Sequence, residues 1–266
     1  MGLAFLPYLR KMSLRSDQPR RPGWPLIVVV IIVTVAVWLA ATTGLGLLLG
    51  PAAFGAGAAE PSPYAVWLPF LVGLLNLVAL GGFGLALGLV TRAVPLARLG
   101  LTARPTWLWL GWVIGVTFGL LPLRIAIGVL YVAVTQDTSL DARSNLIFPE
   151  LTLGAFASAF IGVGVLAPIG EEAFFRGVVY TLLRQRLSAA WSVGLSSLAF
   201  ALAHADSPPV ILTSLIIGLA LAWVYEKTQS LWPGILIHIL NNSVVVVLGF
   251  GALVLLEWLK AQGLSP

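Results

Sequence analysis

The stretch PIGEEAFFRG, residues 168–177, places two adjacent glutamates and an arginine in a part of the chain that is otherwise apolar. The 266-residue chain is 59% hydrophobic and 9% charged, whereas an ordinary soluble domain is about 25% charged. So much apolar surface cannot be buried in one soluble core, so we expect an integral membrane protein. A charged group at the centre of a membrane helix costs about 2.5–3.5 kcal/mol, so residues 168–177 need a structural or functional reason.

Charge-poor runs recur along the chain, and most have the roughly 20 residues with which a helix crosses a bilayer. They are residues 26–49, 64–91, 107–123, 151–170, 187–203, 207–225 and the segment around His238. The alternation typical of strands is absent, and a helix pairs all of its backbone groups internally in lipid. We therefore predict an all-α fold, a polytopic transmembrane bundle of seven to eight helices.

Basic residues at the N-terminus indicate how the bundle is oriented. Residues 1–25 form a basic tail, which we expect in the cytoplasm, and residues 26–266 form one membrane domain. The first apolar run is too long for the core of a signal peptide, so we interpret it as a retained anchor. We expect a multi-pass protein of a prokaryotic plasma membrane and no nucleic-acid partner, because basic residues beside a first span normally set topology.

The charges of later loops favour one long helix through residues 168–177. Loop 92–106 is basic and is expected inside, whereas loops 50–63 and 136–150 are acidic and are expected outside. Arg184 and Arg186 stay inside only if the chain crosses once between residues 151 and 186. We therefore predict a single helix, kinked at Pro168, that carries the EExxxR motif; two short helices joined by a loop are the alternative.

Glu171 and Glu172 point to different faces of this helix. Glu172 and Arg176 are four residues apart, so they share a face and can form an ion pair. Glu171 projects elsewhere and has no local partner. Its partners are therefore expected on other helices.

The chain has two histidines, and both lie in apolar segments. The first occurs as Phe200-x-x-x-His204, and the second as His238-x-x-x-Asn242, so each pair shares a helix face. Estimated depths in the bilayer, at about 1.5 Å per residue, overlap with that of Glu171. We expect Glu171, His204, His238 and Asn242 to meet in one polar pocket.

Peptide hydrolysis could use these four residues in two ways. In one, Glu171 acts as the base on water, His204 shares the water or shuttles the proton, and His238 and Asn242 donate to the oxyanion. In the other, Glu171, His204 and His238 hold a zinc ion. HExxH is absent, and the absence of cysteine excludes a thiolate nucleophile, a disulfide framework and a cysteine zinc site.

The ordered motifs Glu171-Glu172-x-x-x-Arg176, Phe200-x-x-x-His204 and His238-x-x-x-Asn242 resemble the CPBP family of CAAX and bacteriocin-processing proteases. This family includes the Ras-converting CAAX endopeptidase, and the match covers residues 168–242. The resemblance implies a helical intramembrane endopeptidase acting on a peptide at the membrane, prenylated in the eukaryotic relative. It assigns water activation to Glu171 and His204, the oxyanion to His238 and Asn242, and support to Glu172, Arg176 and Phe200. Zinc and metal-free glutamate mechanisms both stay open.

A transporter or a non-catalytic membrane scaffold is the alternative function. Arg124, just after Pro122 in the third predicted span, is the feature that favours a transporter. Snorkelling or a contact with another helix would also explain it. The other polar groups cluster in the second half of the chain and no internal repeat is present, which argues against transport.

Overall fold

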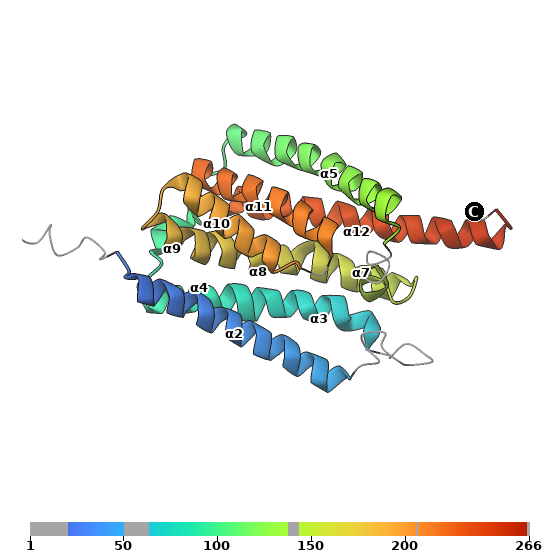
Figure 1. Ribbon diagram of the computed structural model, residues 1–266, viewed down its shortest axis with the longest axis horizontal. Coiled ribbons are helices and arrows are strands. Elements are labelled where there is room, and N and C mark those ends of the chain that lie inside the picture. The colour runs from blue at the N-terminus through green and yellow to red at the C-terminus, as the bar shows by residue number, and fades with distance from the viewer. Residues whose placement is uncertain (1–20, 51–63, 138–143, 206, 265–266) are drawn as a thin grey trace, which may run out of the picture.

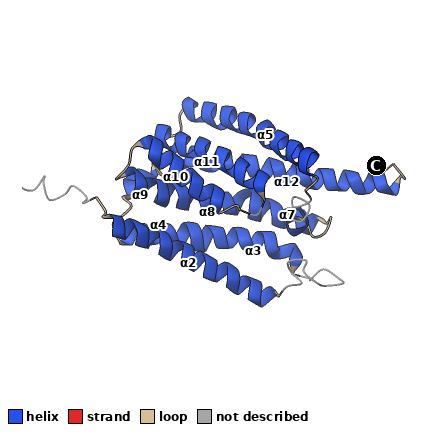
Figure 2. Ribbon diagram, viewed as in Figure 1, coloured by secondary structure: helices blue, strands red, loops and turns tan. Residues whose placement is uncertain are grey.

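The computed structural model describes residues 21–50, 64–137, 144–205 and 207–264. Within these ranges the secondary structure is helical and no strand occurs (Figure 2). Six helical stretches are long and apolar enough to cross a membrane, and a seventh apolar helix is shorter. The predicted all-α membrane bundle is confirmed. Of the predicted tail, residues 1–20 lie outside the part of the chain that the structure describes.

Several spans consist of consecutive helical segments, some of them π-helical (η3, η5 and η6). In chain order the elements are α2 (Trp24–Leu49), η2 (Ala65–Trp67), α3 (Leu68–Leu75), η3 (Asn76–Gly82), α4 (Phe83–Val90), η4 (Leu96–Leu99), α5 (Trp107–Thr135), α7 (Leu153–Ala159), η5 (Phe160–Leu166), α8 (Ala167–Glu172), η6 (Ala173–Tyr180), α9 (Thr181–Arg184), α10 (Ala189–Leu202), α11 (Pro208–Thr228) and α12 (Leu231–Ala261). The run predicted at 187–203 is α10, whose 14 residues are too few for a hydrocarbon core of about 30 Å.

The glutamate motif lies on one continuous helix. Segments α7 to α9 follow one another from Leu153 to Arg184, a stretch of 32 residues. Pro168 stands in the first turn of α8, directly after the π-helical η5. The chain therefore crosses once here, as predicted, and the two-helix alternative is wrong. The irregularity that proline introduces is taken up by a π-helical segment instead of a loop.

Glycines bring this helix into backbone contact with the span at 65–90. A Cβ added at Gly170 would lie 2.2 Å from the carbonyl oxygen of Asn76, and one at Gly162 would lie 2.1 Å from that of Pro69. Small residues permit such close approach between membrane helices. The contact places Asn76 beside Glu171.

The α8 helix occupies the centre of the bundle (Figure 1). It lies between α3 and α4 on one side and α11 and α12 on the other, with α2 and α5 further out. Every residue from Gly170 to Leu182 is buried. The motif is thus shielded from lipid by neighbouring helices.

Candidate active site

The two carboxylate oxygens of Glu171 have different surroundings. Oε1 accepts a hydrogen bond from Asn76 Nδ2 at 3.1 Å. Oε2 lies 3.7 Å from Nε2 of His204 and 3.7 Å from Nε2 of His238. Oε2 is buried and has no hydrogen-bond partner in the part of the chain that the structure describes. The structure therefore brings Glu171 and both histidines together, although both 3.7 Å separations are longer than a direct hydrogen bond.

His204 follows the end of α10 and is held by the backbone. Its Nδ1 lies 2.9 Å from the carbonyl oxygen of Phe200. A carbonyl oxygen only accepts, so Nδ1 carries the hydrogen and Nε2 is the nitrogen directed at Glu171. The Phe200 ring packs against the imidazoles of His204 and His238, at centroid distances of 4.6 and 5.6 Å. Phe200 thus contacts both histidines.

Glu172 anchors the second histidine. Its Oε1 accepts from Arg176 Nη1 at 2.7 Å and from His238 Nδ1 at 3.0 Å. Arg176 also donates from Nη2 to the carbonyl oxygen of Gly218 at 3.0 Å. The side chains of Glu172, Arg176 and His238 are 1–3% exposed. The ion pair expected from the sequence is present, and it fixes His238 with Nε2 toward Glu171.

Asn242 lines the same cavity as Glu171, but its recorded hydrogen bonds go to other residues. Its Nδ2 donates to the carbonyl oxygen of Val163 at 3.2 Å, and its Oδ1 accepts from Arg124 Nη1 at 3.3 Å. The same Arg124 nitrogen donates to Asn241 Oδ1 at 3.1 Å. Arg124 is therefore held in a contact between α5 and α12, which is one of the explanations that the sequence allowed.

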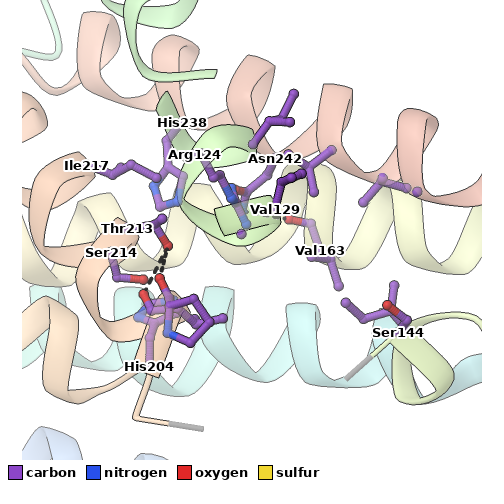
Figure 3. Close-up of a pocket in the computed structure, with 18 of the residues that line it drawn as sticks. Arg124, Val129, Ser144, Val163, His204, Thr213, Ser214, Ile217, His238 and Asn242 are labelled. Carbon is purple, nitrogen blue, oxygen red and sulfur yellow. Dashed lines mark hydrogen bonds between the residues drawn. The ribbon is translucent and has the colours of Figure 1, made fainter. Parts of the chain in front are cut away.

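Two cavities meet at these residues. One, of about 380 Å³, is lined by Arg124, His204, His238 and Asn242 (Figure 3). The other, of about 860 Å³, holds Glu171 and is otherwise lined mostly by apolar side chains from α2, α3, η6 and α10. His204 and Asn242 line both cavities. Glu171 can therefore be approached from the larger cavity, His238 from the smaller one, and His204 from both.

Residues 153–244 match the family described as type II CAAX prenyl endopeptidase Rce1-like. The resemblance to the CAAX proteases is confirmed. The Rce1-like segment includes all three motifs, and the earlier helices lie outside it.

Curated relatives match a similar share of the chain. "UPF0177 protein YaiF" of Lactococcus lactis subsp. lactis (strain IL1403) is 34% identical over 104 residues, 39% of this chain and 43% of that protein. "Putative membrane peptidase YdiL" of Bacillus subtilis (strain 168) is 29% identical over 84 residues, 32% of this chain and 34% of that protein. The chain thus covers less than half the length of these relatives. No solved structure matches it.

Two residues outside the Rce1-like segment complete the site, and the sequence interpretation missed both. Asn76, on η3, contacts Glu171, and Trp38 Nε1 on α2 donates to Asn76 Oδ1 at 2.7 Å. The available signal was a single asparagine in the otherwise apolar run 64–91, since polar groups within a span are rare.

The proposed zinc ligands have suitable chemistry but are not grouped as a metal site. Glu171 offers a carboxylate oxygen, and each histidine has Nδ1 held by an oxygen, as zinc-binding histidines often do. However, among the residues that the structure describes, no group of three or more His, Asp or Glu side chains lies close enough together to hold a metal ion.

Proposed function

We propose that the chain is an intramembrane endopeptidase of the CAAX type, which hydrolyses peptide bonds of membrane-associated substrates. The observation that carries the proposal is the position of Glu171 Oε2, buried and 3.7 Å from two imidazole nitrogens. A carboxylate at this position can accept a proton from water while the imidazoles orient that water. The match to the Rce1-like family and the printed name of the Bacillus relative support the same class of reaction.

The reaction begins with water beside Glu171 Oε2. Glu171 accepts one proton as the water oxygen bonds to the carbonyl carbon of the substrate, which gives a tetrahedral oxyanion. His204 Nε2 accepts the second water hydrogen as a hydrogen bond and orients the nucleophile. When the C–N bond breaks, the proton held by Glu171 passes to the leaving nitrogen. Glu171 then returns to its ionised form.

His238 and Asn242 are the proposed donors to the oxyanion. Since His238 Nδ1 donates to Glu172, Nε2 is the nitrogen left to face the substrate, and it would donate to the oxyanion when it carries a hydrogen. Asn242 lines the same cavity and has a second N–H beyond the one bound to Val163. Both could donate to an oxygen whose charge develops in the transition state.

Zinc, if bound by Glu171, His204 and His238, would supply a more acidic water and polarise the carbonyl. The steps above need protein groups alone. The large apolar cavity beside Glu171 would take the lipid or apolar part of a membrane-anchored peptide. A prenylated C-terminal peptide is one such substrate.

The direct test compares the purified protein with Glu171→Gln on two fluorogenic peptides, one prenylated near its C-terminus and one with an apolar anchor. Gln keeps the shape but cannot accept the proton, so we expect kcat to fall by about 10²- to 10⁴-fold without loss of folding. Cleavage by Glu171→Gln at the unmutated rate would refute the proposal. Chelation with zinc add-back on the active protein distinguishes the mechanisms, because a metal-free site should respond to neither.

A further inference from the structure

A chain of two hydrogen bonds links the second and first spans to the proposed base. Trp38 Nε1, on α2, donates to Asn76 Oδ1 at 2.7 Å, and Asn76 Nδ2, on η3, donates to Glu171 Oε1 at 3.1 Å. Asn76 is 8% exposed, and Trp38, Asn76 and Glu171 all line the larger cavity. Trp38 and Asn76 lie before residue 153, outside the segment that matches the family.

The direction of both bonds is fixed by chemistry. The indole of Trp38 can only donate, so it selects the carboxamide orientation in which the oxygen of Asn76 faces it. The amide nitrogen must then face Glu171, and an ionised carboxylate only accepts. Without the indole N–H beside it, the Asn76 carboxamide could rotate by about 180° and present its oxygen to Glu171. The two oxygens would then repel each other. Trp38 therefore keeps Asn76 in its donating orientation.

The bond to Oε1 decides where the other oxygen of Glu171 points. With Oε1 held by Asn76, Oε2 is directed at the two imidazoles. The surrounding side chains are largely apolar, so the other local contacts of the carboxylate are not directional. We infer that Asn76 is a positioning residue for Glu171 and that Trp38 acts through Asn76. This inference rests on the proposed function of Glu171.

A purely structural role for Asn76, as a polar link between membrane helices, makes a different prediction. The backbones of η3 and α8 already touch through Gly170, so their spacing does not depend on the Asn76 side chain. A structural link would change the amount of folded protein but leave the turnover of each folded molecule unchanged. A positioning residue changes kcat, since a misplacement of about 1 Å can slow a reaction about 100-fold.

The experiment measures kcat and KM per folded molecule, with the two fluorogenic peptides, for Asn76→Leu, Trp38→Phe and the double variant. We expect Asn76→Leu to lower kcat about 10- to 100-fold with KM within about twofold. Trp38→Phe, which loses the N–H donor and part of the ring volume, should lower kcat less. The double variant should match Asn76→Leu, because Trp38 acts through Asn76. Trp112→Phe is the matched control, since its buried Nε1 has no hydrogen-bond partner among the described residues.

Each outcome decides the matter. Unchanged kcat for folded Asn76→Leu would overturn the positioning role, and losses that multiply in the double variant would overturn the dependence of Trp38 on Asn76. If Asn76→Leu does not fold, Trp38→Phe decides alone, and a kcat equal to that of Trp112→Phe overturns the inference. If Glu171→Gln is also fully active, the proposed function has failed; if Glu171→Gln is inactive while Asn76→Leu is not, only this inference has failed.

Discussion

At the scale of single residues, one carboxylate oxygen of Glu172 accepts two hydrogen bonds. Oε1 neutralises Arg176 and orients His238, and all three side chains are buried. We predict that Arg176→Met will destabilise the folded protein by about 3–5 kcal/mol, because it leaves a buried carboxylate without its cation. Glu172→Gln added to Arg176→Met should restore most of that stability, since the amide oxygen still accepts from His238 Nδ1. Thermal unfolding in detergent measures this, and a double variant as unstable as Arg176→Met would contradict it.

Arg124 has a comparable role toward Asn242. One guanidinium nitrogen donates to the side-chain oxygens of Asn241 and Asn242, which leaves Nδ2 of Asn242 facing Val163 and the cavity. A hydrogen bond to a charged group contributes about 1.5–3 kcal/mol. We predict that Arg124→Met will lower kcat/KM for peptide cleavage by about tenfold by releasing Asn242. Asn241→Ala is the matched control and should lower kcat/KM less. Equal losses of kcat/KM in the two variants would show that Arg124 does not act through Asn242.

At the scale of elements, the proline and its π-helical segment explain why Asn242 lies where it does. Pro168 has no N–H, so it cannot donate to Gly164 in an α-helix or to Val163 in a π-helix. Instead, the carbonyl oxygen of Val163 accepts from Asn242 Nδ2 at 3.2 Å, and that of Gly164 accepts from Ser243 Oγ at 3.3 Å. The break in one helix is thus satisfied by side chains of α12. This ties the glutamate helix to the helix that carries His238.

The glycine contact between the second span and the glutamate helix gives a further prediction. A Cβ at Gly170 would meet the Asn76 backbone at 2.2 Å, so Gly170→Ala must push η3 away from α8. We expect lower thermal stability and, because Asn76 moves from Glu171, a kcat at least about tenfold lower. Gly119→Ala is the control: nothing lies within 4 Å of a Cβ there, so stability should stay equal or rise by up to about 1 kcal/mol. Equal effects of the two substitutions would contradict this packing.

At the scale of the whole molecule, the sequence predicts what is local and misses what depends on helix rotation. Apolar run length predicted six spans correctly, whereas the run 187–203 forms a helix too short to cross. Four-residue spacing identified the Glu172–Arg176 pair. The contact of Asn76 with Glu171 joins residues 95 apart in the chain and depends on how each helix is turned about its axis. No periodicity encodes that rotation in a span with apolar residues on all sides. The π-helical segments likewise rotate the side chains that follow them about the helix axis, and the sequence pattern does not predict this rotation.

The loop charges predict how the whole bundle is oriented in the membrane, and the fold shows which loops lie at the same end of it. Hydrogen bonds from Arg186 to the carbonyl oxygen of Pro22, from Gln185 to that of Ala93 and from Tyr225 to that of Arg98 gather the basic loops at one end. We expect this end in the cytoplasm.

Because the chain contains no cysteine, single cysteines can report on this orientation without background. Leu96, 64% exposed, lies at the basic end, and Leu153, 81% exposed, begins the glutamate helix at the opposite end. In intact cells a membrane-impermeant maleimide should label Leu153→Cys and not Leu96→Cys, and both should react after permeabilisation. The cysteine-free parent is the control for nonspecific labelling. Labelling of Leu96→Cys alone in intact cells would show that the bundle has the opposite orientation. The basic end would then face outward, contrary to the positive-inside rule.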